Sequence, residues 1–490
     1  MRYRFIGLIS CIFVLLLAYS ATILTGNDKD RVHQHQEALK PSCSHDDDAF
    51  CSHLPLVQIN TGGAVIPGKP IYDESGRRTG GFVLSEDGTD SIRGTIDIID
   101  HQDTRNHFGD TPVLTSLMEI RIRGNSSRDF DKSSYRIDMI HEDGSNNSQT
   151  VMGMDAHHEW ILYGPYLDKT LIRNYMWYNI AGEIMDYAPN VRFCEVSING
   201  EYRGLYVMME SITAGDDGAR LNLTVNRDNN TFAGYLLRLD RNFDEPEKNL
   251  TNFTAYTLRT KQTVEVVYPG RKNFTNQIRH SIQRDFSDFE KALYSYDYND
   301  KKHGYDSYID YMSFVDYFLI NEITCNYDAG WMSTYMYKDL NGLYKMCIWD
   351  FNSACNNYQH GMEIDGFQMQ DTLWYFMLIK DVDFTDQIIR RYKALRKTYF
   401  SDEYLYGYIE DVISYLGESI ERNYDIWGYS FEEEYDFLIP SERNPRNYED
   451  AISQLKEFLA YRIEWMDNNI EALRQYSAHS KVKKFDIDAN

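Results

Sequence analysis

Apolar and polar residues alternate along much of the first half of the chain, from about residue 54 onward. The segments 94–100, 119–124 and 135–139 carry an apolar side chain at nearly every second position. This is the period of a β-strand with one buried face, as in antiparallel sheets. Strands are therefore expected in these segments, in a hairpin that turns at residues 199–200, and at 54–60, 81–86, 234–240, 256–260 and 264–269.

Helical spacing replaces this alternation from about Ile282. The segment 447–476 places Ile452, Leu455 and Leu459 along one stripe, as in a helix with one buried face. An earlier helix is expected after Asp168, which suits an N-cap, because apolar residues recur at helical spacing between 171 and 184. A strand-rich first half and a helical second half predict an α+β chain with two lobes around a cleft. The other expected helices are 286–296, 307–324, 371–381, 384–400 and 403–424.

Two acidic residues, Asp328 and Asp350, close short apolar or aromatic runs at the centre of the chain. Between them, 334–338 and 343–349 read as strands joined by a turn whose Asn-Gly pair supplies the positive φ of a tight hairpin. Such a hairpin would bring Asp350 back to the end where Asp328 lies. Two carboxylates held together suit a divalent cation and a phosphate chain, as in phosphoryl transfer. The same pattern is also typical of solvated acids in turns.

A second unusual stretch is the basic turn that follows the strand 119–124. Arg121 and Arg123 lie on one face of this strand, a Gly-Asn-Ser-Ser turn follows, and Lys132 and Arg136 come shortly afterwards. Arginine forks and the backbone amides of such a turn are good phosphate ligands. An ordinary hairpin with a charged solvent face is the alternative interpretation.

Composition and charge narrow the function classes. The chain has 490 residues, of which 42% are hydrophobic and 14% aromatic, so it can build a sizeable core. Its formal net charge of −25 argues against a general nucleic-acid binder, which needs a basic face. A bound nucleotide would therefore need a local basic patch or metal ions to overcome the acidic background.

The N-terminus predicts export. Residues 1–25 form a long apolar run behind two arginines, which indicates a signal anchor with the rest of the chain outside, or a cleaved signal peptide. Residues 26–53 are polar and aperiodic, as in a linker, and 481–490 read as a loose tail. In an exported chain, Cys43 and Cys51 could close a short disulfide loop.

These motifs, taken in order, resemble the spore-coat-protein-H (CotH) family of atypical, protein-kinase-like enzymes. The resemblance extends from Leu54 to about Tyr476. It implies a bilobal kinase-like domain over 54–480, with an N-lobe to about 281 and a C-lobe beyond. It also implies ATP with Mg²⁺ or Mn²⁺, and transfer of the γ-phosphoryl group to Ser or Thr of surface or coat proteins. The motifs are LPLVQINT, EIRIRGNSSRDFDKSSYRIDM, WILYGPYLDKTLIRN, NGEYRGLYVMMESI, FVDYFLINEITCNYD, YKMCIWDFNSA, RRYKALR and LKEFLAYRIEWMD.

The resemblance also implies roles for particular residues. Asp328 corresponds to the catalytic Asp that orients the attacking hydroxyl and accepts its proton, and Asp350, with Asn352, to the metal site. Lys132 or Arg136 would take the role of the nucleotide-binding lysine, with Glu183 as its helix partner, and Glu210 would lie near the adenine. The residues expected near the phosphates are Arg121, Arg123, Gly124, Asn125, Ser126 and Ser127.

The chain departs from the family pattern at two positions. Ser333 stands five residues after Asp328, where Asn is common, and Asn352 replaces the second acid of a Trp-Asp-x-Asp motif. The loss of one negative ligand is expected to weaken Mg²⁺ binding. A catalytically silent surface or coat component that uses this fold for adhesion or assembly is therefore the alternative to a kinase, and a sugar acceptor also stays open.

Overall fold

The computed structural model describes residues 31–41, 50–215, 220–224, 234–241 and 246–477. The chain divides into two units, Met1–His33 and Gln34–Asn490, and the following account concerns the second unit. The predicted membrane or signal segment 1–25, the tail 481–490 and Cys43 lie outside the described residues. Within the described part of the chain, the structure contains no helix with the length and apolarity required to cross a membrane.

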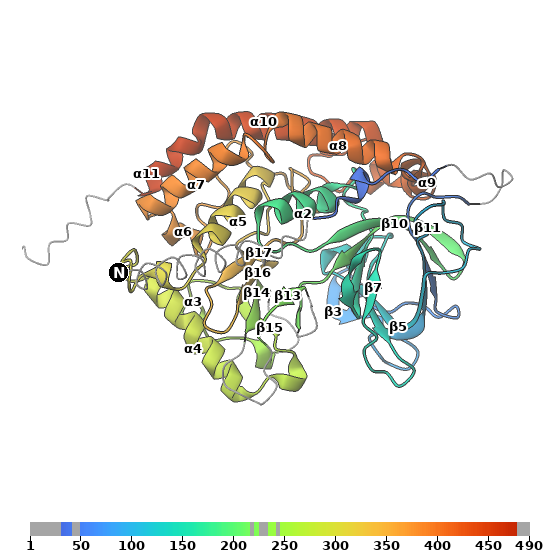
Figure 1. The fold of residues 1–490 in the computed structure, drawn as a ribbon, viewed down its shortest axis with the longest axis horizontal. Helices are drawn as coiled ribbons and strands as arrows, with labels where there is room; N and C mark the ends of the chain where they lie inside the picture. Colours follow the sequence, from blue (N-terminus) through green and yellow to red (C-terminus); the bar gives the residue numbers. More distant parts are fainter. Residues whose placement is uncertain (1–30, 42–49, 216–219, 225–233, 242–245, 478–490) are drawn as a thin grey trace, which may run out of the picture. The chain divides into compact units, whose positions relative to one another are not determined.

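The predicted alternating strands form a closed barrel (Figure 1). Its strand order is β1-β10-β11-β9-β6-β5-β4, in which β1 and β10 are parallel and the other neighbours antiparallel. Alternate side chains such as Ile96, Ile98, Met118, Ile120 and Ile137 are buried in the barrel core, which explains the period of two. The strands are β1 (Leu56–Asn60), β4 (Ile92–Ile99), β5 (Leu114–Arg123), β6 (Ser134–Ile140), β9 (Glu159–Tyr163), β10 (Val191–Ile198) and β11 (Glu201–Glu210).

Short hairpins and bridges extend from the barrel. The predicted turn between β10 and β11 is confirmed, with positive φ at Asn199 and Gly200. A strand was expected at 81–86, but the hairpin strand there ends at Phe82. The short strands are β2 (Pro70–Tyr72), β3 (Arg78–Phe82), β7 (Gln149–Val151), β8 (Met154–His157), β12 (Ala214–Gly215) and β13 (Leu221–Asn222).

A second sheet has the order β15-β14-β16-β17. It joins β14 (Tyr235–Asp240) and β15 (Thr263–Tyr268) to β16 (Thr334–Lys338) and β17 (Lys345–Cys347). The predicted hairpin between Asp328 and Asp350 is thereby confirmed as β16–β17. β14 pairs with β16 of this hairpin, and β15 pairs with β14. These two strands, assigned to the N-lobe from the sequence, therefore share a sheet with elements from the expected C-lobe.

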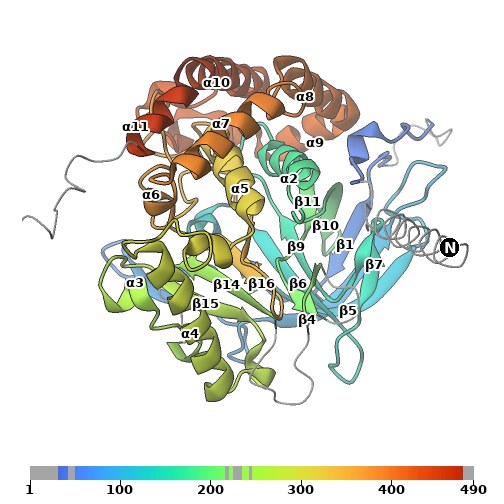
Figure 2. The same cartoon turned by 60° about the vertical axis from the view of Figure 1, so that its left-hand side comes forward.

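Helices pack on this sheet and on the barrel. Figures 1 and 2 show α2 and α5 lying below α10, and α5 contacts both α7 and α10. Side chains of Asp310, Asp381, Ser401 and Asn447 cap the N-termini of α5, α7, α8 and α10. The helices are α2 (Arg173–Ile184), α3 (Phe253–Tyr256), α4 (Asn276–Leu293), α5 (Tyr311–Thr324), α6 (Tyr375–Leu378), α7 (Val382–Leu395), α8 (Asp402–Leu416), α9 (Glu418–Trp427), α10 (Tyr448–Asn469) and α11 (Arg474–Ser477).

Three further sequence expectations are corrected. The strand expected at 256–260 is absent from this described segment, because α3 ends there and its last turn continues to Leu258, at φ 56°. The helix expected at 371–381 is reduced to α6, and the one at 403–424 is divided at Gly417, which has φ 47°. Within the predicted linker 26–53, Gln34 is buried and its side-chain amide bonds both backbone polar groups of Phe193.

The C-terminal helices also contact the barrel directly. Asn423 of α9 accepts hydrogen bonds from the Lys132 ammonium and from the backbone N–H of Leu205 in β11. Nearby, the Arg422 guanidinium bonds both carboxylate oxygens of Glu195, which is fully buried in β10. The last third of the described chain therefore packs against the first.

Candidate functional site

A cavity of about 750 Å³ lies between the barrel and the second sheet. The barrel supplies the ends of β5, β6 and β9 with the turn at 124–128, and the sheet supplies β14, β15 and β16. Loops that follow α5 and β17 add the two acids of the predicted site. The sequence-predicted residues that line this cavity are Arg121, Arg123, Gly124, Asn125, Ser126, Ser127, Arg136, Asp328, Asp350 and Asn352.

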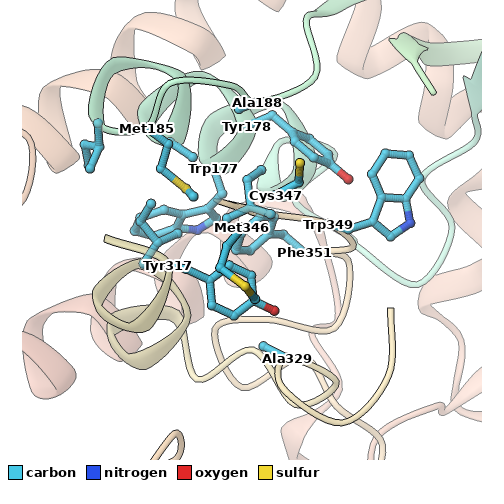
Figure 3. Packing of buried hydrophobic residues seen from close by; sticks show 14 of the residues in the cluster. Trp177, Tyr178, Met185, Ala188, Tyr317, Ala329, Met346, Cys347, Trp349 and Phe351 are labelled. Carbon is cyan, nitrogen blue, oxygen red and sulfur yellow. The ribbon is translucent and has the colours of Figure 1, made fainter. Parts of the chain in front are cut away.

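Helix α2 holds the loop that carries Asp350. The backbone N–H of Asp350 donates to the Tyr178 hydroxyl at 3.0 Å, and the N–H of Phe351 donates to the Asn174 side chain at 2.8 Å. Trp177 stacks on Phe351, and Tyr178 packs against both Trp349 and Phe351, the residues on either side of Asp350 (Figure 3). These contacts fix Asp350 although its φ is 62°, a conformation uncommon outside glycine.

Asp328 lies in the loop that leaves the end of α5. Cys325 ends this helix in the left-handed conformation, and the carbonyl of Asp328 accepts hydrogen bonds from the N–H groups of Trp331 and Met332. The Asn326 side chain donates to the carbonyl of Trp349 at 3.3 Å, so it joins the loop of Asp328 to the loop of Asp350. The two acids of the sequence hypothesis are thus carried on connected loops.

Three carboxylates influence one another in the cavity. Burial raises the pKa of Asp328 to about 7, and the negative charges of Asp350 and Asp240 add to this effect. Burial also raises the pKa of Asp350, against the lowering influence of Arg123, and that of Asp240, the last residue of β14. The site therefore collects negative charge that a cation would relieve.

The barrel side of the cavity is rich in arginine. Burial and the neighbouring charges of Arg121 and Arg123 lower the pKa of Arg128 to about 10. Arg121 pairs with Asp90, whereas Arg123 lies 5.7 Å from the ring centroid of Trp349. The turn requires glycine at 124, because its φ is 109° and a Cβ would lie 1.9 Å from the Ser127 hydroxyl oxygen. Positive charge and a tight turn thus face the acids across one cavity.

Several predicted nucleotide contacts lie elsewhere or are already paired. The Lys132 ammonium is buried and donates to the carbonyl of Leu205 as well as to Asn423, away from the cavity lining. Glu183 accepts from the Tyr399 hydroxyl, and buried Glu210 accepts from the backbone and side chain of Asn190. Arg136 does line the cavity, but it is held by Asp138 and Glu159.

The sequence pattern of the CotH kinase protein family matches residues 120–466 of this chain. The chain belongs to the CotH kinase protein family. It is also similar to the inner spore coat protein H of Bacillus subtilis (strain 168), with 30% identity over 95 residues. That match covers 19% of this chain and 24% of the Bacillus protein.

The lining of the CotH cavity offers an oxygen atom that suits a metal ion bound to a phosphate chain. The side-chain oxygen of Asn352, beside Asp350, is buried and accepts no hydrogen bond from the described residues. Among these residues, no group of three or more His, Cys, Asp or Glu side chains is arranged to hold a metal ion by itself. Mg²⁺ commonly takes one or two carboxylates and completes its shell with phosphate oxygens and waters, and this site offers that partial set.

Sequence reasoning missed several residues of the CotH cavity. Asp240 closes an apolar strand, which is the same signal that identified Asp328 and Asp350, so it could have been found. Arg238 of β14 pairs with Glu265 of β15, and this pairing depends on strand register. The roles of Asn174 and Tyr178 carried no sequence signal, because they act on backbone atoms more than 170 residues away.

Proposed function

We propose that this CotH protein is an exported phosphotransferase that transfers the γ-phosphoryl group of ATP, with Mg²⁺ or Mn²⁺, to Ser or Thr of surface or coat proteins. The observation that carries this proposal is the meeting of Asp328 and Asp350 with the arginine-rich turn at one cavity of about 750 Å³. A cavity of this size accommodates a nucleotide. The Bacillus relative is a spore coat protein by name, which supports coat or surface proteins as acceptors.

The proposed fold is bilobal and kinase-like, with the barrel as one lobe and the helices with the second sheet as the other. The N-terminal apolar segment is proposed to direct export and to tether the chain to a membrane, unless it is cleaved. The strongly acidic chain leaves nucleic acid out of the proposed partners.

Each group in the cavity has a proposed task. Asp328 accepts the proton of the acceptor hydroxyl as its oxygen bonds to the γ-phosphorus and the bond to ADP breaks, and a pKa near 7 suits a general base. Asp350 and the Asn352 oxygen would hold the metal, which neutralises phosphate charge when bound. Arg123 and the amides of the 124–128 turn would position the phosphates.

The apolar part of the cavity is proposed to hold the base of the nucleotide. Ile161 and Met209 of the barrel, with Ile212 and Val267, line this part. Glu210 lies between two lining residues but is turned toward Asn190, so the adenine contact is assigned to the neighbouring backbone and apolar side chains.

A catalytically silent coat or surface protein is the second candidate. It is favoured by Asn352, which offers an oxygen without charge, and by the pairing of Arg136 with two carboxylates. In this candidate the cavity has lost turnover and the fold serves adhesion or assembly.

Nucleotide-dependent thermal shift with and without Mn²⁺, followed by transfer from labelled ATP, separates the two candidates. We expect ATP and Mn²⁺ to raise the melting temperature of the wild type and not of Asp350→Ala. We also expect Asp328→Ala to bind nucleotide but to lose transfer by about 10²–10⁴-fold. No shift at millimolar ATP would contradict the phosphotransferase, whereas a shift without transfer to any coat or surface protein would favour the silent candidate.

A further inference from the structure

A pair of stacked tyrosines lies beside Asp328, outside the lining of the cavity. The rings of Tyr327 and Tyr358 are parallel within 14°, with centroids 3.8 Å apart, and Tyr327 is 41% exposed. Tyr327 immediately precedes Asp328 in the chain, and Tyr358 lies in the segment that follows Asp350. The charge of Asp328 also contributes to the raised pKa of Tyr358, for which the hydrogen bond to Tyr327 is the largest cause. An exposed aromatic surface therefore borders the catalytic carboxylate.

The segment that carries Tyr358 is firmly held. The Arg443 guanidinium donates to the carbonyls of Asn356, Tyr358 and Gln359, at 2.6, 3.0 and 3.1 Å. Asn356 has φ 57°, and such conformations persist where the surroundings impose them. The N–H of Ile439, which is itself half-exposed, donates to Gln359 at 2.7 Å. The tyrosine pair is thus a rigid surface, so little conformational entropy is lost when a ligand binds to it.

The position of the tyrosine pair beside Asp328 indicates that the acceptor, and not the nucleotide, contacts it. In the proposed function, the nucleotide fills the cavity and its γ-phosphate lies near Asp328 and Asp350. The acceptor hydroxyl must then approach Asp328 from outside the nucleotide, past the residues at this border. In an extended chain successive residues are about 3.3 Å apart, so a ring next to Asp328 meets a residue one to three positions from the acceptor.

We propose that the Tyr327–Tyr358 pair is a docking surface for the acceptor polypeptide and selects an apolar or aromatic residue next to the phosphorylated Ser or Thr. This inference rests on the proposed phosphotransfer and names the acceptor class for the same site. Aromatic rings also bind sugars, so an oligosaccharide is one arm of the test. The acceptor in the proposed function is a Ser or Thr side chain, and the pair is therefore assigned to a polypeptide.

The test uses two synthetic peptides bound to the full chain in the presence of Mn²⁺ and a non-hydrolysable ATP analogue. One peptide has Ser in a glycine background with Trp two residues away, and the other has Gly in place of Trp. Fluorescence anisotropy gives both dissociation constants without turnover. We expect the Trp peptide to bind about threefold to tenfold more tightly to the wild type.

The variants Tyr327→Ala and Tyr358→Ala are expected to abolish this preference, with the dissociation constant for the ATP analogue unchanged. Tyr327→Phe is the matched control, because it keeps the ring and should keep the preference. Tyr296→Ala removes a more exposed ring elsewhere on the surface and should change nothing. Melting temperatures of all variants verify that they fold.

Equal binding of both peptides to the wild type, or an unchanged preference in the alanine variants, would overturn the docking surface. Ring-dependent binding of an oligosaccharide in place of the peptides would overturn its assignment to a polypeptide. Failure of the proposed function is a distinct result, since it appears as the absence of a nucleotide-dependent thermal shift in the wild type.

Discussion

At the scale of single residues, the acidic side chains of the cavity lower the free energy of unfolding of the protein without bound ligand. Asp328, Asp350 and Asp240 each have a raised pKa, because burial disfavours their ionised forms, and the charge of Asp240 adds to this effect at Asp328 and Asp350. Ionisation of these carboxylates in the native state therefore lowers the free energy of unfolding. Such perturbed groups in a cavity are typical of functional sites, although ion-pair networks can also produce them.

The variant Asp328→Asn is expected to be more stable than the wild type at pH 8. In the unfolded chain the pKa of Asp is near 3.9, so between about pH 4 and 7 the native state binds more protons and its free energy of unfolding falls as pH rises. Asn does not ionise, so the variant should gain about 1–2 kcal/mol at pH 8, allowing for solvent at the cavity. Urea unfolding without metal measures the difference.

The gain should disappear near pH 4, where Asp328 is protonated in both states. Asp365→Asn, at an exposed acid, is the control and should show no comparable gain at either pH. A gain that is independent of pH would show that the charge of Asp328 is not its cause.

The variant Asn352→Asp is expected to bind Mn²⁺ with nucleotide more tightly. The Asn352 oxygen already lies buried beside Asp350 without a hydrogen-bond donor among the described residues, so a carboxylate there adds charge at the same place. We expect a threefold to tenfold lower dissociation constant by calorimetry, equivalent to about 1 kcal/mol. Asn352→Ala should weaken binding, and an Asp variant no tighter than the Ala variant would contradict the assigned metal position.

At the scale of elements, the periodicity of the sequence predicted most of what was found. Alternation marked β4, β5 and β6 because one face of each strand fills the barrel core. Alternation wrongly predicted a strand at 256–260. This segment packs against no hydrophobic core, and a short helix ends there instead. The acids at strand ends were predictable for the same local reason, whereas Lys132 was misplaced because its burial depends on α9, far along the chain.

Helix α5, which leads to Asp328, is fixed by a buried ion pair with α10. The Glu322 carboxylate accepts from the Arg462 guanidinium and from the backbone N–H groups of Gln368 and Met369, and both charged side chains are fully buried. These bonds join α5, α10 and the segment before α6. The ion pair thus stabilises the base of the acid-bearing loop.

Arg462→Met is therefore expected to destabilise the fold by about 3–5 kcal/mol, because it leaves the buried Glu322 carboxylate without its counter-charge. The double variant Glu322→Gln with Arg462→Met should recover part of this loss. Chemical denaturation measures both. Equal stability of the single variant and the wild type would show that Glu322 is neutral in the fold.

At the scale of the whole molecule, the barrel and the C-terminal helices form one structure. Asn423 of α9 accepts from buried Lys132, and Arg422 accompanies it by pairing with Glu195 of β10. Local periodicity cannot predict such contacts, since they join residues 291 and 227 positions apart. The sequence accordingly indicated a strand-rich and a helical part but not the helix, α9, that joins them.

The variant Asn423→Ala is expected to destabilise the protein by about 1–3 kcal/mol, because it removes an acceptor from a buried ammonium group. Asn423→Asp is the matched comparison. The side-chain nitrogen of Asn423 has no hydrogen-bond acceptor among the described residues, so a carboxylate loses no bond there and supplies a counter-charge to Lys132. We expect the Asp variant to exceed the Ala variant in calorimetric melting temperature at pH 7, and the reverse order would contradict this role of Asn423.

The closed barrel has a consequence for how the molecule meets other chains. A sheet with free edges can recruit a strand from another polypeptide, which is one route to both peptide recognition and aggregation. Closure through β1, with β10 on one side and β4 on the other, leaves the barrel no such edge. A polypeptide that meets the barrel must therefore be recognised there through side chains and loops, and crowding at a surface will not turn the barrel into a template for fibres.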